Sequence, residues 1–248
     1  MTEKEKLEIL KKFWSDKNDP HHHHKSEDWF DKYYREFYFH TGGYDSITDV
    51  GCGSGEFLIR FASDFKKVTG LDMSESMVEE AKKKVNQSGA TNISVHCGAA
   101  LDIDKSLTEK TDVIFSNGVV QYLAPPQFKT FVAKCMPLLN ENGIIMMMNI
   151  PNFNLEVLYY LGLFKNTDNK ITAKELQQKI RKFNFMIWKQ KLRNPGYEYE
   201  PGLGFWHSIP DVKTFAAELG LEAEFYNSIY FPYGYRFHVR FSRKVNTV

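Results

Sequence analysis

The sequence lacks long hydrophobic runs, a large net charge and a pairing pattern among its cysteines. No apolar stretch in its 248 residues approaches the roughly 20 residues of a membrane-spanning helix, so no membrane partner is expected. Thirty-two Lys and Arg offset 31 Asp and Glu, and the net charge of +1 gives no bulk attraction to nucleic acid or membrane. The three cysteines (Cys52, Cys97 and Cys135) are odd in number and unpaired in spacing, which predicts a reduced, cytoplasmic protein.

The sequence also lacks internal repeats, and its one compositionally biased segment is the run His21–His24. Four adjacent side chains cannot all converge on one ion, and no cysteine lies nearby as a further ligand. We therefore predict an exposed loop there and no metal site.

The length suits one α/β domain with elaborations and is short for two domains. From about residue 46 to 150, β-rich and amphipathic segments alternate. Strands are predicted near 46–50, 68–72, 93–97, 111–116 and 144–150, and helices at 74–87 and 125–139. This alternation predicts a parallel sheet with helices on both faces.

The flanking segments follow a different pattern. Residues 1–45 are aromatic at helical spacing and predict an N-terminal helical segment, whereas 46–248 form the main domain. Residues 151–206 interrupt the alternation as an insert, helical at about 173–192. A helix over 208–220 and two strands joined by Pro232-Tyr233-Gly234 then close the sheet as an antiparallel hairpin.

The most informative segment is Asp49-Val50-Gly51-Cys52-Gly53-Ser54-Gly55, between the first strand and the next helix. Glycines at Gly51, Gly53 and Gly55 let a ligand approach the backbone and its N–H groups without meeting a Cβ. Asp49 opens the motif at a position where its carboxylate can receive a cationic group. The pattern predicts a nucleotide-like ligand that also carries an ammonium.

The spacing of residues in this segment excludes two other kinds of nucleotide-binding site. The dinucleotide fingerprint needs its third glycine one residue later, where this chain has Glu56, and a carboxylate is unfavourable beside a pyrophosphate. A phosphate-binding P-loop fails because no Gly-Lys-Ser/Thr follows the turn.

The Asp-x-Gly-x-Gly-x-Gly pattern instead resembles motif I of the class I S-adenosylmethionine-dependent methyltransferases, of the small-molecule type. The resemblance implies a Rossmann-like, seven-stranded, mostly parallel sheet with an antiparallel last strand. It also implies S-adenosylmethionine as cofactor, with its methionine half wrapped by the glycine loop. Motifs carry this resemblance over about residues 46–150, and strand order alone carries it over the remainder.

Further residues extend the implied cofactor site. Asp72 ends the second strand, 21 residues after Gly51, where a carboxylate can bind both ribose hydroxyls. Met73 would lie against the adenine. The family often has an acidic residue at the position of Ala99, which leaves the backbone of Ala100 or the Asp102 side chain to read the adenine edge. The alternative is that Ala99 and Ala100 only pack.

The segment after the fourth strand resembles the family's motif IV region, in which Asn117 would line the cleft. Many small-molecule members carry histidines where this chain has Gln121 and Tyr122, so Tyr122 becomes a catalytic candidate. In the family an aromatic segment before motif I often folds over the cofactor, so the resemblance implies a lid in residues 1–45, with Tyr33 and Arg35 as candidates and Arg35 paired to the cofactor carboxylate. Ordinary helix packing is the alternative for both.

His207 precedes the helix that returns the chain to the sheet, which makes it a candidate general base or acceptor ligand; a structural histidine is the alternative. Residues 165–193 carry nine basic against two acidic residues, either a solvated helix face or a site for an anionic acceptor. We predict methyl transfer to an O or N atom of a small polar, anionic metabolite by a monomer or homodimer. An RNA or protein methyltransferase, or a non-catalytic cofactor-binding subunit, remains an alternative.

Overall fold

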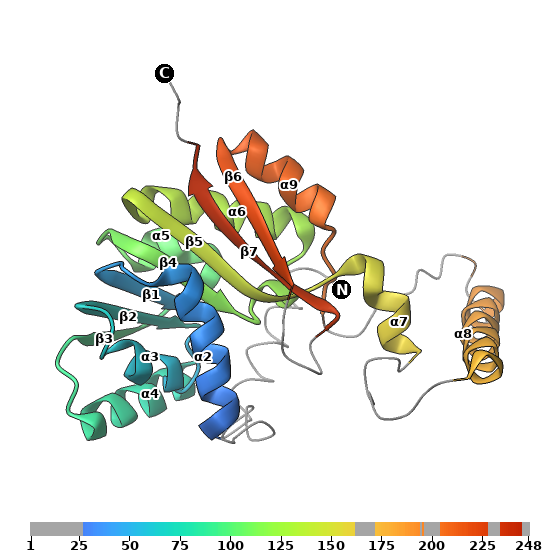
Figure 1. Cartoon of the computed structure of the whole chain (residues 1–248), viewed down its shortest axis with the longest axis horizontal. Helices are drawn as coiled ribbons and strands as arrows, with labels where there is room; N and C mark the ends of the chain where they lie inside the picture. The colour runs from blue at the N-terminus through green and yellow to red at the C-terminus, as the bar shows by residue number, and fades with distance from the viewer. Residues whose placement is uncertain (1–26, 162–171, 194, 196–203, 228–233, 245–248) are drawn as a thin grey trace.

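A seven-stranded sheet in the order β3-β2-β1-β4-β5-β7-β6 organises the chain (Figure 1). The coordinates are a computed structural model that describes residues 27–161, 172–193, 195, 204–227 and 234–244. The strands are β1 (Ser46–Val50), β2 (Lys67–Asp72), β3 (Ile93–Cys97), β4 (Thr111–Asn117), β5 (Leu139–Pro151), β6 (Leu221–Asn227) and β7 (Arg236–Arg243). The first five pair in parallel, and β7 lies antiparallel between β5 and β6. This topology confirms the predicted fold class and the predicted pairing of the last two strands.

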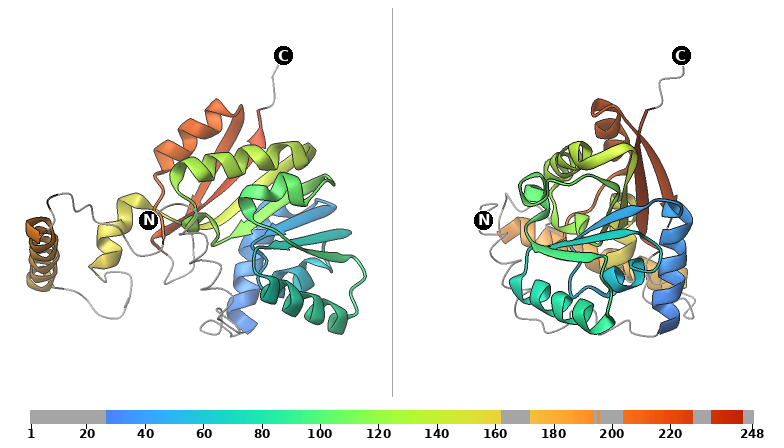
Figure 2. Two further views of the ribbon diagram at one scale, coloured as in Figure 1. Left: turned by 180° about the vertical axis from the view of Figure 1, so that it is seen from behind. Right: turned by 90° about the vertical axis from the view of Figure 1, so that its left-hand side faces the viewer.

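Helices cover both faces of the sheet, as the views in Figure 2 show. One face packs against α2 (Glu27–Thr41), α3 (Glu56–Phe61) and α4 (Glu75–Ser88) through an aromatic cluster that includes Phe37, Phe61 and Phe115. The ring centroids of Phe37 and Phe115 lie 4.5 Å apart, edge to face. On the other face, α6 (Pro125–Cys135) and α9 (Ile209–Glu218) bury the second core cluster, with Phe128 and Phe215 in contact. The parallel part of the sheet is thus buried on both faces, as is usual for parallel strands.

The helix boundaries follow local chemistry. Ser74 caps α4 by accepting a hydrogen bond from the Met77 N–H, and Gly89 ends the helix in the left-handed region. The helix predicted at 125–139 is shorter in the structure: α6 ends at Cys135, and Pro137 lies in the following 3₁₀ turn, η4 (Met136–Leu138). The fifth strand is accordingly longer than predicted, and it starts at Leu139.

The connections between strands contain short elements. Residues between β3 and β4 form only η2 (Ala100–Asp102) and α5 (Ile103–Ser106), and η3 (Val120–Tyr122) follows β4. The predicted insert after β5 contains η5 (Phe153–Leu155), α7 (Glu156–Tyr160) and α8 (Ala173–Arg193). Figure 1 places α8 at one end of the molecule, away from the sheet. None of the helices in the described part of the chain combines the length and the apolar character that a membrane span requires.

Candidate functional site

The glycine loop follows β1 and turns through three left-handed positions. Gly51, Gly53 and Gly55 have φ values of +80°, +54° and +84°. A Cβ on Gly51 would lie 2.2 Å from Cγ2 of Val119, so only glycine fits there. A Cβ on Gly53 would meet nothing within 4 Å, which leaves this part of the loop open. The loop is therefore packed on one side and open to a ligand on the other.

A cavity of about 280 Å³ lies between this loop and the carboxyl ends of the first four strands. In open α/β sheets, this edge is where ligands bind. The lining residues are Gly51, Gly53, Asp72, Met73, Met77, Gly98, Ala99, Ala100, Leu101, Asp102, Asn117, Gly118, Val119, Gln121, Tyr122 and Leu123. The cavity therefore brings together most of the predicted residues from four separate strand ends, but Gly55 is not among the described residues that line it.

Asp72 joins the end of β2 to the glycine loop. One carboxylate oxygen accepts a hydrogen bond from the Gly53 N–H at 2.9 Å, and the other accepts one from the Ser74 N–H at 2.9 Å. These bonds fix the carboxylate at the cavity wall and link the loop to the start of α4. The sequence alone predicted that Asp72 ends the strand, but it did not predict these two hydrogen bonds.

Carboxylates make the surroundings of the loop electronegative. Asp49 is buried, and burial together with the charges of Asp72 and Glu56 raises the pKa of its carboxyl well above the ordinary value. Glu56 is also largely buried, which alone would raise its pKa, but hydrogen bonds from Lys84 and Ser54 outweigh burial and lower it. Asp49 does not line the cavity, so it would act on a bound ligand through the charge that it gains on ionisation and not by contact.

The adenine-side residues of the prediction also meet at this cavity. Met73, Ala99 and Ala100 all line it, together with the apolar side chains of Met77 and Leu101. Asp102 lines it too, but its carboxylate pairs with Lys105 Nζ at 2.7 Å. An apolar wall of this kind accepts a flat heteroaromatic ring.

A polar network that the sequence did not predict supports Asn117. Asn149 donates a hydrogen bond from Nδ2 to Oδ1 of Asn117 at 2.9 Å. Asn149 lies at a shift of register in β5 and has a φ of +60°, where asparagine is tolerated better than most residues. Its N–H donates to Nδ1 of His238 at 3.1 Å, and its carbonyl accepts from Arg236. The polar Asn149 within the otherwise apolar run from Ile144 to Ile150 was the available sequence signal.

The same network reaches α2. His238 is fully buried, and its Nε2 lies 3.3 Å from Oε1 of Glu36. Arg236 donates from Nη2 to Oε1 of Gln121 at 3.0 Å, next to the cavity. The strand bulge at Asn149 is thus held between the N-terminal helix and the wall of the cavity.

The two catalytic candidates lie in different places. Tyr122 lines the cavity, and burial raises the pKa of its phenol. His207 is 2% exposed, does not line the cavity, and places Nε2 3.1 Å from the Val120 carbonyl oxygen. Burial lowers the pKa of His207 to about 4, so the ring is neutral at pH 7 and donates to this carbonyl. The position of His207 behind η3 fits a role in holding that turn.

The N-terminal candidates do not meet the cavity. Arg35 lies exposed on α2 and is not among the described residues that line the cavity. The side chain of Tyr33 lies outside the described part of the structure, as does the whole His21–His24 run. On the same helix, Tyr34 is buried and donates a hydrogen bond to Asp64. The described part of α2 packs on the sheet face rather than over the glycine loop.

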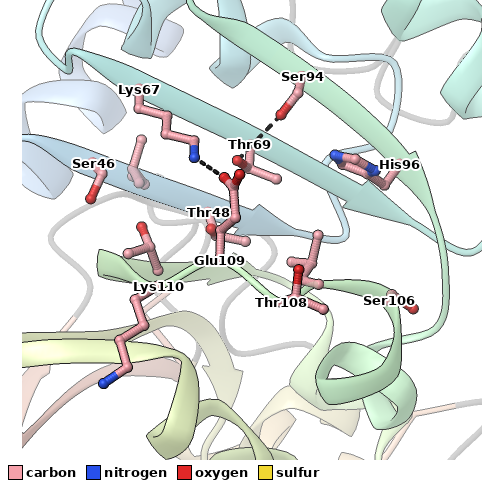
Figure 3. Close-up of a pocket in the computed structure, with 13 residues that line it drawn as sticks. Ser46, Thr48, Lys67, Thr69, Ser94, His96, Ser106, Thr108, Glu109 and Lys110 are labelled. Atoms are coloured by element: carbon pink, nitrogen blue, oxygen red, sulfur yellow. Dashed lines mark hydrogen bonds and ion pairs between the residues drawn. The ribbon is translucent and has the colours of Figure 1, made fainter.

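A second cavity, of about 400 Å³, lies at the opposite, amino-terminal edge of the strands (Figure 3). Its floor is polar, with Thr48, Thr69 and Ser94 in register on three neighbouring strands. An ion pair between Lys67 and Glu109 crosses it. This cavity is larger, but it contains none of the motif residues and lies at the edge that α/β sheets rarely use for ligands.

Comparison with known proteins identifies similar sequences and similar folds. Residues 47–143 match the family model described as a methyltransferase domain. The chain is 37% identical over 153 residues to carboxy-S-adenosyl-L-methionine synthase of Campylobacter jejuni, an alignment that covers 60% of each protein. It is 29% identical over 133 residues to malonyl-[acyl-carrier protein] O-methyltransferase of Priestia megaterium, which covers 49% of this chain and 46% of that protein.

Among solved structures, one similar fold is phosphoethanolamine N-methyltransferase 1 of Haemonchus contortus, in complex with phosphoethanolamine and S-adenosylhomocysteine. The TM-score is 0.64 at 16% identity, and the match covers 100% of this chain and 51% of that one. The chain therefore spans about half to three fifths of the length of these relatives. The likeness at this identity concerns the fold.

Proposed function

We propose, on the premise that this chain carries a class I S-adenosylmethionine-dependent methyltransferase domain, that its glycine-loop cavity binds S-adenosylmethionine and serves methyl transfer to a small acceptor. The premise rests on the family match over residues 47–143 and on the strand order with its antiparallel β7. The cofactor and the acceptor class go beyond that premise.

The charge of the cavity is the observation that carries the proposal. Its described lining contains Asp72 and no basic residue, the carboxylate of the lining residue Asp102 is paired with Lys105, and buried Asp49 adds a further carboxyl beneath the loop's first turn. A pyrophosphate would be repelled there, whereas a ligand with sulfonium and ammonium charges is attracted. The apolar wall around Met73 and Leu101 accommodates the adenine, with the Asp72 carboxylate beside the ribose.

When bound, this cofactor supplies an electrophilic methyl group on sulfur. The protein must then position the acceptor in line with that group and exclude water. We assign the positioning to Asn117 and Tyr122, which border the cavity at the end of β4. Tyr122 stays a neutral phenol at pH 7 because its pKa is raised, so it orients the acceptor by hydrogen bonding and takes up no proton.

We further propose that the acceptor is a small polar molecule methylated on O or N. Support comes from the relatives' names, which describe a carrier-bound malonyl O-acceptor and phosphoethanolamine as an N-acceptor. Each of these acceptors carries an anionic group.

A single experiment tests the proposal. Purified protein is incubated with cofactor labelled in the methyl group and with a fractionated metabolite extract, RNA and total protein in separate reactions. Label transferred to a compound in the metabolite fraction supports the small-molecule assignment. Transfer only to RNA or protein would contradict it.

One relative suggests a second candidate function. The 37% identical synthase is named for a carboxylated derivative of S-adenosyl-L-methionine, so a reaction on the cofactor itself deserves a test. Mass spectrometry of the products separates the two candidates. Methyl transfer yields S-adenosylhomocysteine and a methylated acceptor, whereas a cofactor-modifying enzyme yields a heavier sulfonium and no S-adenosylhomocysteine.

Replacing Asp72 by alanine is expected to weaken cofactor binding by more than tenfold, about 1.4 kcal/mol, because the ribose hydroxyls and the Gly53 N–H lose their acceptor. Titration calorimetry with S-adenosylmethionine measures this change. Asp104→Ala, on α5 and outside the cavity lining, serves as a matched control that keeps wild-type affinity. An Asp72→Ala protein with unchanged affinity would refute the ribose assignment.

Substitutions of the two catalytic candidates are expected to separate orientation from base catalysis. Because neither side chain acts as a base in this proposal, Tyr122→Phe should lower kcat by less than the roughly 100-fold expected for loss of a general base. His207→Gln keeps a donor near the Val120 carbonyl and should leave the pH–rate profile unchanged between pH 6 and 8. If the pH–rate profile of His207→Gln instead loses one of its limbs, His207 is the general base.

A further inference from the structure

Exposed apolar side chains are concentrated in the insert. Ten large hydrophobic residues are exposed in the described part of the chain, and eight of them lie between residues 153 and 192. They are Phe153, Val157, Leu158, Ile180, Phe185, Met186, Trp188 and Leu192. Figures 1 and 2 both place α7 and α8, which carry most of them, at the same end of the molecule. Concentrated exposed apolar surface of this kind marks an interaction site.

The outer face of α8 carries the strongest part of this surface. Phe185, Trp188 and Leu192 follow at intervals of three and four residues, which puts them on one face of the helix. They are 60%, 57% and 63% exposed, and the rings of Phe185 and Trp188 lie 5.7 Å apart between centroids. The stripe that contains Phe183 and Ile187 is half-buried. The three outer side chains are thus available to a partner.

Charge is concentrated on the same helix. Within its 21 residues α8 has seven Lys and Arg and one acidic residue, Glu175. The chain as a whole has a net charge of only +1, so the rest of the protein is net acidic and the overall value conceals the asymmetry. A helix rich in Lys and Arg with exposed Trp, Phe and Leu is typical of segments that lie in the interface of an anionic membrane.

We propose that α8, with the adjoining α7, docks the protein on the surface of an anionic lipid bilayer. Trp188, Phe185 and Leu192 would enter the headgroup boundary, and the surrounding basic side chains would contact lipid phosphates and carboxylates. The seven cations exclude insertion across the bilayer. The insert follows the carboxyl end of β5, the edge that also holds the glycine-loop cavity, so docking would keep that edge near the membrane.

The other occupants fit less well. Single-stranded RNA would use the aromatic rings but gains nothing from the exposed aliphatic Leu192, Met186 and Ile180. A second copy of the chain would bring two basic helices together. Exposed apolar side chains also occur outside α8, at Phe153 on η5 and at Val157 on α7, which favours a broad partner surface over a narrow groove that admits one helix.

Vesicle sedimentation of the full chain, without cofactor or acceptor, tests the docking independently of methyl transfer. We expect binding to phosphatidylcholine vesicles with 30% phosphatidylserine, little binding to pure phosphatidylcholine, and a loss of binding as salt is raised. The variant Phe185→Ala/Trp188→Ala/Leu192→Ala should lose most of the binding. Lys182→Gln and Lys189→Gln should each weaken it by roughly fivefold, the equivalent of about 1 kcal/mol for each cation.

Matched controls come from other helices. Phe39→Ala removes an aromatic residue that is 84% exposed on α2, and Lys82→Gln/Lys83→Gln removes two exposed charges from α4; both should bind as the wild type does. Three outcomes would overturn the proposal: no binding to phosphatidylserine vesicles, equal binding to neutral vesicles, or an unaffected triple variant. Tighter binding to poly(U) than to vesicles, lost in the same α8 variants, would assign the surface to nucleic acid instead.

Discussion

Replacing Gly51 by alanine is expected to abolish detectable cofactor binding and to destabilise the protein by about 2–5 kcal/mol. The left-handed φ of +80° costs a residue with a Cβ roughly 1–2 kcal/mol. The new Cβ would also lie 2.2 Å from Cγ2 of Val119, and relieving such an overlap costs about 1–3 kcal/mol. Because Val119 and Gly51 both line the cavity, the relief of this overlap displaces its wall. Chemical denaturation and titration calorimetry measure the two effects.

Two further variants separate backbone strain from the clash. Gly89 has a φ of +71° and no atom within 4 Å of the position that a Cβ would take. Gly89→Ala should therefore lower the free energy of unfolding only by the backbone strain, about 1–2 kcal/mol, and leave cofactor binding intact. Val119→Ala removes the clashing methyl group. The double variant Gly51→Ala/Val119→Ala should therefore be more stable than the sum of its single effects by at least about 1 kcal/mol. If the stability effects of Gly51→Ala and Val119→Ala simply add in the double variant, the expected contact between the new Cβ and Val119 is contradicted.

The glycine loop and the strand ends could be predicted because both are encoded locally. Gly51, Gly53 and Gly55 stand directly after a β-branched segment, and Asp72 ends the next strand along the chain. Parallel pairing of β1 with β2 and with β4 then forces these ends to meet at one edge. The cavity walls at Ala99 and Asn117 follow from the same geometry. Local pattern plus sheet topology thus gives most of the proposed cofactor site.

The contacts that support the site could not be predicted in this way. His238 and Asn149 are 89 residues apart in sequence, and His207 and Val120 are 87 apart. Nothing in the local sequence of His207 distinguishes a residue that faces a cavity from one that lies behind its wall. Whether His207 faces the cavity or lies behind its wall depends on how the turn η3 packs against the start of α9 and on burial by Phe128. Side-chain partners across such separations depend on tertiary packing and cannot be read from periodicity.

Replacing Asp49 by asparagine is expected to stabilise the ligand-free protein at neutral pH and to weaken cofactor binding at the same time. Burial and the Asp72 and Glu56 charges raise the pKa of Asp49 in the native state. The native state therefore retains a proton that the unfolded state loses above about pH 4. Stability falls as the pH rises from there through the raised native pKa. Asparagine removes this loss, and we expect a gain of at least about 1 kcal/mol, or roughly 2–4 °C in Tm.

The same charge should favour a cationic ligand. Wild-type affinity for S-adenosylmethionine should rise with pH through the ionisation of Asp49, whereas the Asp49→Asn variant should bind at least tenfold more weakly at neutral pH, about 1.4 kcal/mol, without this rise. Thermal melts and calorimetry from pH 4 to 8 measure both effects, and the Tm difference should vanish at the acid end. Glu109→Gln removes a charge from an exposed surface pair and should shift stability by less than about 1 kcal/mol. If Asp49→Asn lowers both stability and affinity at every pH, Asp49 is a structural hydrogen-bonding residue. If the variant is more stable but binds the cofactor more weakly, the Asp49 carboxylate lowers the stability of the protein and favours the cationic cofactor.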